Sequence, residues 1–325
     1  MNALDTLLSP VVLFFALGLC AALLRSPMSV PQSFAKGLAI YLMMAIGLKG
    51  GVEMSKTAID GQVFAVFGAA TILSFGMPLI AYAALRFTSG LSKTDAAATA
   101  GHYGSISIVT FVAAIEALRI AGVPSSGYLV AVAAIMETPA IITALWLAMR
   151  GSKKSDADEV ARDKGELARE VLLNASIVVL LGALVIGAVA GAEGYERLSP
   201  FFTAPFQGIL CLFMLDMGLN AGRGLRRGWR KLGVAPILFG IYMPLIGASI
   251  AAVCCILIGL QPGDMALLMV LSASASYIAV PAAMRLALPE SDPSVYLTLS
   301  LGVTFPFNIA LGIPLYIAAA SMLAG

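Results

Sequence analysis

The chain has 325 residues, of which 60% are hydrophobic and 12% are charged, and its formal net charge is +2. A soluble domain is about one quarter charged, so this composition excludes an ordinary soluble protein and indicates a polytopic protein in contact with membrane lipid. The small net charge, without basic stretches that alternate with aromatic residues, argues against nucleic acid as a partner.

Apolar stretches long enough to cross the hydrocarbon core recur along the chain. We interpret the first as a spanning helix and not as a signal peptide, because it has neither a basic leader nor a clear cleavage site. The sequence therefore predicts an all-α protein with ten transmembrane helices. Their predicted positions are 8–24, 36–49, 62–86, 95–117, 127–149, 171–190, 203–220, 233–260, 263–286 and 293–322.

A strongly polar segment, residues 150–170, divides the chain into residues 1–149 and 171–325. Its mixed charges are typical of a solvated linker, here on the cytoplasmic side. The halves on either side of it resemble each other: MPLI at 77–80 recurs at 243–246, and further similarities follow in the same order at nearly the same offset. Because each half has five predicted spans, the second enters the membrane from the opposite side, which predicts a 5+5 inverted repeat.

The distribution of basic residues predicts the orientation of the chain. If both termini lie outside, 16 of the 20 Lys and Arg residues fall on the cytoplasmic side, where such residues accumulate. We therefore predict a multi-pass protein of the cell (inner) membrane with both termini outside.

Two predicted spans, the fourth and the ninth, contain residues that disfavour a continuous helix. The fourth contains GHYGSISIVTF at 101–111, and each of its two glycines weakens a helix by about 1 kcal/mol relative to alanine. The ninth contains SASASYIAVP at 272–281, where the proline lacks an amide donor. Small residues in either stretch could serve only close helix packing. Their occurrence at equivalent places in both halves instead favours two broken helices that form a polar site near the middle of the membrane.

The serines in these stretches are spaced two residues apart, so their hydroxyls share one side only if the backbone is extended. Broken helix ends also provide amide donors for an anion, while carbonyl and hydroxyl oxygens suit Na⁺. We predict that substrate contacts Gly104, Ser105, Ser107, Ser272, Ser274 and Ser276.

An ionisable residue inside a span is a functional candidate by default. Glu137 lies about midway along the fifth predicted span and is followed by Thr138, and Asn308 lies in the corresponding region of the second half. We predict a sodium site formed by Glu137, Thr138, Asn308 and Ser276, because hard cations prefer oxygen ligands. No transition-metal site and no other cofactor is predicted, since the four cysteines lack the spacing of metal ligands.

Six segments of the chain form a pattern that is specific only when they are taken together: 41–51, 104–118, 136–144, 210–221, 272–289 and 301–316. In these segments the chain resembles the cyanobacterial sodium-dependent bicarbonate transporters of the SbtA type and their bacterial relatives. The resemblance implies a homotrimeric secondary transporter that takes up bicarbonate with Na⁺ between the broken fourth and ninth spans. It also implies a PII-like cytoplasmic regulator as a partner, although the linker is shorter here. Tyr277 stands where the cyanobacterial proteins have an aspartate.

Other functions are compatible with these residues. The same architecture could carry another small anion such as an organic carboxylate, or could bind an anion and signal without transport. An intramembrane enzyme would use His102 with Ser105, but nucleophilic catalysis needs a third group that orients the base, and no such residue accompanies them. We therefore predict no catalytic residues, and we expect His102 to be a packing residue rather than a proton relay.

Overall fold

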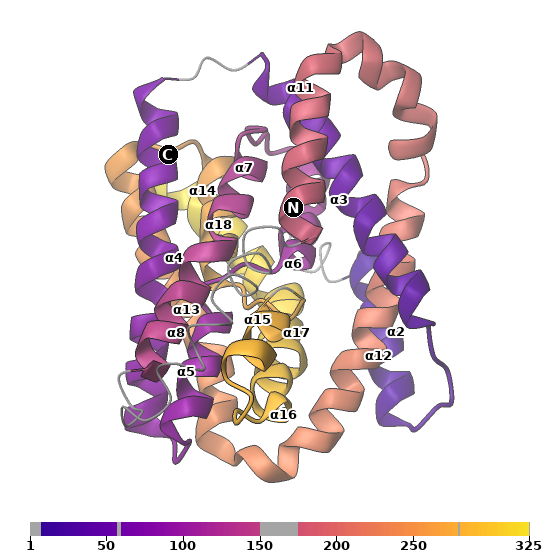
Figure 1. The fold of residues 1–325 in the computed structure, drawn as a ribbon. Helices are drawn as coiled ribbons and strands as arrows, with labels where there is room; N and C mark the ends of the chain where they lie inside the picture. The colour runs from indigo at the N-terminus through magenta and orange to yellow at the C-terminus, as the bar shows by residue number, and fades with distance from the viewer. Residues whose placement is uncertain (1–7, 57–59, 150–174, 279, 325) are drawn as a thin grey trace.

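The computed structural model describes residues 8–56, 60–149, 175–278 and 280–324, and these residues are helical without any strand (Figure 1). The predicted linker, residues 150–170, lies outside the described residues. The all-α prediction is confirmed. The helices are α2 (Pro10–Leu23), α3 (Gln32–Met54), α4 (Gly61–Thr88), α5 (Lys93–His102), α6 (Ile108–Ala121), α7 (Leu129–Ile135), α8 (Glu137–Met149), α11 (Ala175–Phe202), α12 (Phe206–Leu232), α13 (Val234–Ile258), α14 (Pro262–Ala273), α15 (Val280–Ala287), α16 (Pro293–Leu297), the π-helical turns Thr298–Thr304 and Asn308–Gly312 around α17 (Phe305–Phe307), and α18 (Ile313–Leu323).

Six described helical segments are long and apolar enough to cross a membrane. Two shorter apolar helices, Pro10–Leu23 and Pro262–Ala273, accompany them. This supports a multi-pass membrane protein, because about 20 apolar residues are needed for one crossing. The six segments are Gln32–Met54, Gly61–Thr88, Leu129–Ala148, Ile177–Phe202, Val234–Ile258 and Pro293–Leu323.

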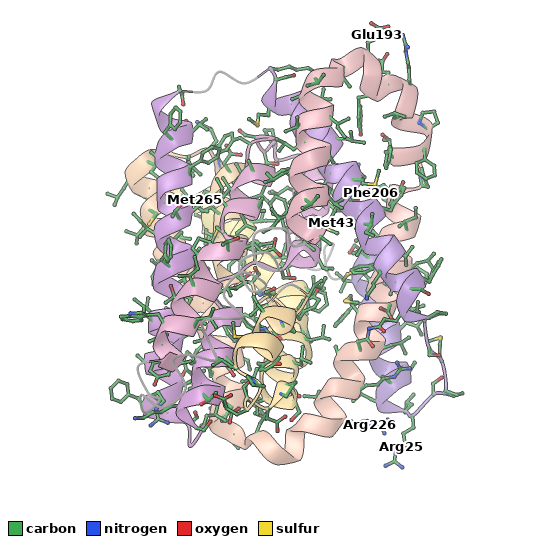
Figure 2. All side chains as sticks on the ribbon, in the orientation of Figure 1. Arg25, Met43, Glu193, Phe206, Arg226 and Met265 are labelled. Atoms are coloured by element: carbon green, nitrogen blue, oxygen red, sulfur yellow. The ribbon has the colours of Figure 1, made fainter. Side chains whose placement is uncertain are left out.

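The seventh predicted span, 203–220, is shorter than the helix in the structure, because α12 continues to Leu232. Hydropathy falls where the arginines begin, but the helix continues, and two of these side chains find acceptors near the end of α2. Arg226 donates to the carbonyl oxygen of Ala22 at 2.9 Å, and Arg223 donates to that of Met28 at 2.5 Å. Arg25 and Arg226 lie at one end of the molecule and Glu193 at the other (Figure 2).

Two helix pairs, α2 with α12 and α3 with α11, pack closely against each other. They occupy one side of the molecule, and α4, α5, α8 and α13 occupy the other (Figure 1). Glycines allow the close approach of the backbones: a Cβ atom at Gly51 would overlap the carbonyl oxygen of Leu184, and one at Gly187 would overlap that of Leu48. Small residues serve this purpose at membrane helix interfaces.

Replacement of Gly187 by leucine is expected to lower the stability of the protein by about 2 kcal/mol, because the added atoms would push α11 away from α3. The thermal unfolding midpoint in detergent measures this effect. Gly182→Leu is the matched control, since Gly182 lies in the same helix with open space beside it. An equal loss of stability in both variants would contradict the packing argument.

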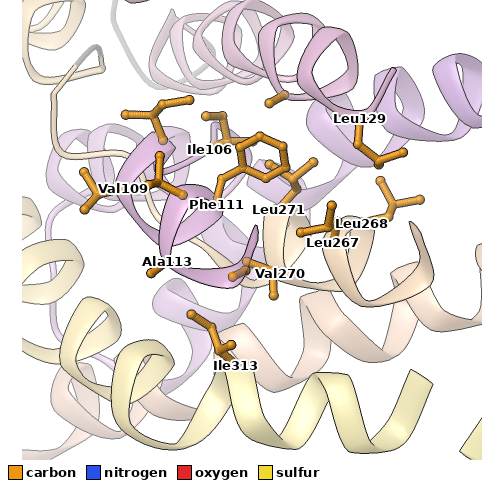
Figure 3. Close-up of a cluster of buried hydrophobic side chains, with 14 of the residues drawn as sticks. Ile106, Val109, Phe111, Ala113, Leu129, Leu267, Leu268, Val270, Leu271 and Ile313 are labelled. Carbon is orange, nitrogen blue, oxygen red and sulfur yellow. The ribbon is translucent and has the colours of Figure 1, made fainter. Parts of the chain in front are cut away.

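A buried apolar cluster connects α6, α7, α14 and α18 (Figure 3). Phe111 of α6 and Leu271 of α14 are almost fully buried in it, and Ile106, just before α6, joins the same cluster. Ile106 belongs to a non-helical stretch of the chain. The cluster therefore fixes that stretch against the surrounding helices.

Candidate functional site

In two places, a stretch of non-helical backbone separates a helix from the next helix in the chain. Helix α5 ends at His102 and α6 begins at Ile108, while α14 ends at Ala273 and α15 begins at Val280. Residues 103–107 and 274–278 are non-helical. Such backbone is tolerated at membrane depth only where it is buried in protein or faces a watery cavity, so its hydrogen bonds need to be accounted for.

The two non-helical stretches bond to each other. The backbone N–H of Ser107 donates to Ser274 Oγ at 2.9 Å, and the backbone N–H of Ser276 donates to the carbonyl oxygen of His102 at 2.8 Å. A third contact joins His102 Nδ1 to the carbonyl oxygen of Ser276 at 2.5 Å. Segments more than 160 residues apart thus satisfy polar groups that a helix would otherwise satisfy internally.

Ser107 also begins the next helix. Its hydroxyl oxygen accepts hydrogen bonds from the backbone N–H of Thr110 at 3.2 Å and from Thr110 Oγ1 at 2.9 Å, so Ser107 is the N-cap of α6. The partial positive charge of a helix N-terminus therefore lies beside this serine.

A small cavity lies where the two stretches meet, and four of its lining residues are polar: Ser107, Glu137, Ser276 and Tyr277. It leaves ≈ 10 Å³ for the centre of a water-sized sphere, which is room for one water molecule or one small cation and too little for a polyatomic anion. The lining is completed by Ile106, Ile108 and Ile278.

Glu137 is 5% exposed, and no hydrogen bond or ion pair joins its carboxylate to the described part of the chain. A buried carboxylate without a partner is costly unless a cation or a proton neutralises it. Carboxylate and hydroxyl oxygens are ligands that hard cations prefer, so the cavity residues fit Na⁺.

Some predicted substrate residues lie away from this cavity. A Cβ atom at Gly104 would overlap Pro78 and the carbonyl oxygen of Ser74, so this glycine allows contact with α4. The hydroxyls of Ser105 and Ser272 are buried without a hydrogen-bond partner among the described residues. Ser274 Oγ donates to the carbonyl oxygen of Leu271 at 2.9 Å while it accepts from Ser107.

Two of the predicted sodium ligands do not line the cavity. Asn308 is fully buried, its amide donates to the carbonyl oxygen of Ala273 at 2.9 Å, and its Oδ1 accepts from Tyr316 at 3.0 Å. Asn308 therefore satisfies the C-terminal end of α14. Thr138 is partly exposed beside Glu137. The structure brings Ser107, Ser276 and Glu137 together, but not these two side chains.

Tyr277 lines the cavity although the sequence did not place it among the site residues. Its ring packs edge-on against Phe305 with a centroid distance of 5.3 Å, and Phe305 packs in the same way against Phe15 of α2, also at 5.3 Å. A signal was present in the sequence, because Tyr277 directly follows the serine series. The aromatic contacts to Phe305 and Phe15 could not be read from it.

A larger cavity of ≈ 490 Å³ lies between α3, α6 and the loop that precedes α7. Lys49, Glu53 and Arg119 line it, and Phe111 lies on its wall. Phe111 belongs to the same apolar cluster as Ile106, which lines the small cavity (Figure 3). The same apolar cluster therefore contributes to the walls of both cavities.

Comparison with known proteins agrees with a cation-binding membrane protein. The family model of the Na⁺-dependent bicarbonate transporter superfamily matches residues 10–321. A search of curated proteins gives no match. The family is one of transporters and not of enzymes. Since the match extends over nearly the whole chain, the protein belongs to the Na⁺-dependent bicarbonate transporter superfamily.

Proposed function

We propose that the protein is a secondary active symporter that takes up bicarbonate together with Na⁺. The observation that carries this proposal is the buried, unpaired carboxylate of Glu137 in a cavity for one small cation. A cation bound there would neutralise the carboxylate and place positive charge beside the broken helices. That charge and the N-terminus of α6 would both attract an anion.

The proposed sodium site comprises Glu137 and Ser276, with Thr138 next in sequence and Asn308 as a support for the end of α14. Bicarbonate would bind near Ser107 and the other serines of the two non-helical stretches once the small cavity widens. In this order, Na⁺ would bind first and bicarbonate second, which fits a cavity that is large enough for the cation alone.

The inverted repeat of ten spans is supported by equivalent contacts in the two halves. Asp264, early in α14, accepts from the backbone N–H of Ser126 at 2.6 Å, just before α7. Asp95, early in α5, accepts from the backbone N–H of Asp292 at 2.8 Å, just before α16. The pairing of α2 with α12 and of α3 with α11 exchanges the halves in the same way.

We propose that the larger cavity is the entrance from outside, with both termini on that side. Arg25 and Arg226 lie at the opposite end, where basic residues would face the cytoplasm (Figure 2). The homotrimer and the PII-like regulator are predictions that come from the resemblance alone.

The proposal is tested with purified protein in liposomes. An inward Na⁺ gradient should drive accumulation of labelled bicarbonate, and replacement of Na⁺ by K⁺ should abolish it. Na⁺-driven uptake of a labelled small carboxylate, without uptake of labelled bicarbonate, would favour the organic anion carrier. Binding of bicarbonate without accumulation would favour a sensor and contradict transport.

A further inference from the structure

The side chain of His102 bonds to the backbone that forms the small cavity. His102 Nδ1 lies 2.5 Å from the carbonyl oxygen of Ser276, and the backbone N–H of Ser276 donates to the carbonyl oxygen of His102 at 2.8 Å. A carbonyl oxygen only accepts, so Nδ1 is the nitrogen that carries the proton. In a neutral imidazole, Nε2 is then the acceptor nitrogen.

Each of these bonds satisfies a carbonyl group that has no helical partner. The carbonyl of His102 belongs to the last turn of α5, and Ser276 lies in non-helical backbone. Both residues are buried, so bulk solvent does not replace either bond. The His102 side chain thus supplies a donor that the backbone of residues 274–278 needs.

The orientation of the imidazole ring is fixed by a second contact. It stacks on the ring of Tyr296 of α16, with a centroid distance of 4.5 Å and an angle of 25° between the planes. The ring is also fully buried. His102 therefore has one well-defined orientation, as a residue that positions another group requires.

The bonded residue, Ser276, lines the cavity directly, and so does the next residue, Tyr277. A change at His102 would move both of them relative to Glu137 without touching the cavity itself. The equivalent position in the second half of the chain is Leu271, whose side chain cannot donate a hydrogen bond. There the hydroxyl of Ser274 forms the link between the two halves instead.

We propose that His102 is a positioning residue that holds Ser276 and Tyr277 in place at the cavity through its Nδ1–H donor. This role depends on one part of the proposed function, the binding of Na⁺ in the small cavity. His102 itself does not bind the cation and does not relay protons.

The first test uses the fact that His102 is the only histidine of the chain. Protein purified with a histidine-free tag and labelled with ¹⁵N in the imidazole should give NMR signals for a single ring. We expect a proton on Nδ1 and none on Nε2 at neutral pH. A proton on Nε2 and none on Nδ1 would overturn the proposal.

The second test compares two substitutions that keep different nitrogen positions. Asparagine places its amide nitrogen near that of Nδ1, whereas glutamine places it near that of Nε2. His102→Gln should raise the Na⁺ concentration for half-maximal uptake about tenfold with little change in the maximal rate, as expected for one lost hydrogen bond. His102→Asn should rescue most of this loss. Equal impairment by both substitutions, or none by glutamine, would contradict the proposal.

These tests separate the inference from the proposed function. Titration of the wild-type protein with NaCl, with KCl as the control, should shift the imidazole signal without any bicarbonate present. A shift by Na⁺ without bicarbonate uptake would contradict the proposed substrate and support the role of His102. If both variants fail to fold, the NMR experiment on the wild-type protein still decides the inference.

Discussion

Replacement of Glu137 by alanine is expected to lower Na⁺-driven bicarbonate uptake at least a hundredfold. The carboxylate is the one ionisable group among the residues that line the small cavity, apart from the Tyr277 phenol. Loss of one partner of a buried charge pair costs about 3–5 kcal/mol, which corresponds to a factor of roughly 100 to 4,000 in affinity. Initial uptake rates over a range of Na⁺ concentrations measure the effect.

The control for Glu137→Ala is a carboxylate that does not line the small cavity. Glu193 is suitable because it is exposed and pairs with Arg197 at 2.6 Å on the surface. Exposed ion pairs contribute at most about 1 kcal/mol, so Glu193→Ala should retain uptake. Glu137→Asp should be intermediate, since it keeps the charge but shortens the side chain. Unchanged Na⁺ dependence in Glu137→Ala would exclude this residue as a sodium ligand.

Replacement of Asp264 by alanine is expected to destabilise the protein by about 3–5 kcal/mol, because several donors would lose a charged acceptor at once. Its carboxylate accepts from the backbone N–H of Ser126 at 2.6 Å, from Ser126 Oγ at 2.7 Å and from Tyr128 Oη at 3.1 Å. Asp264 itself is 6% exposed. The thermal unfolding midpoint in detergent should fall by at least about 6 °C.

A smaller loss of stability is expected at Asp95, the equivalent position in the first half of the chain. This carboxylate is partly exposed and accepts from Ser92 Oγ at 2.7 Å and from the backbone N–H of Asp292 at 2.8 Å. The backbone N–H of Asp95 in turn donates to Ser92 Oγ at 3.0 Å. Among the described residues, one bond, that from Asp292, therefore joins this carboxylate to a distant part of the chain. Asp95→Ala should lower the midpoint by less than half as much as Asp264→Ala. An equal or larger loss at Asp95 would contradict the difference in burial on which the comparison depends.

The residues of the candidate site illustrate how far the sequence could lead. Glu137 was found because a carboxylate in an apolar span has few structural explanations. Ser107 and Ser276 were found because their spacing fits extended backbone, and the structure places both at the small cavity. The amide oxygen of Asn308 predicts a sodium ligand, but in the structure its amide nitrogen donates to the carbonyl oxygen of Ala273. Residue type alone does not distinguish a sodium ligand from a residue that satisfies the backbone at a helix end.

His102 and Tyr277 show the opposite case. His102 was expected to pack as a lone membrane histidine, and its contact with Ser276 became visible only in three dimensions. In the sequence, Tyr277 is a departure from the proteins that the chain resembles, while its place in the cavity and its contact with Phe305 depend on the fold. Both contacts join elements that are adjacent only because the non-helical stretches meet.

The sequence by itself determined that this protein is helical and spans a membrane, because hydropathy and helix-disfavouring residues act locally along the chain. It also determined which polar residues are unusual enough at membrane depth to be candidates. Only the tertiary structure decided which of them share a cavity, since residues 174 positions apart, such as His102 and Ser276, bond according to how the helices pack. That packing depends on side-chain fit and close backbone approach between distant helices, which no local pattern of residues encodes.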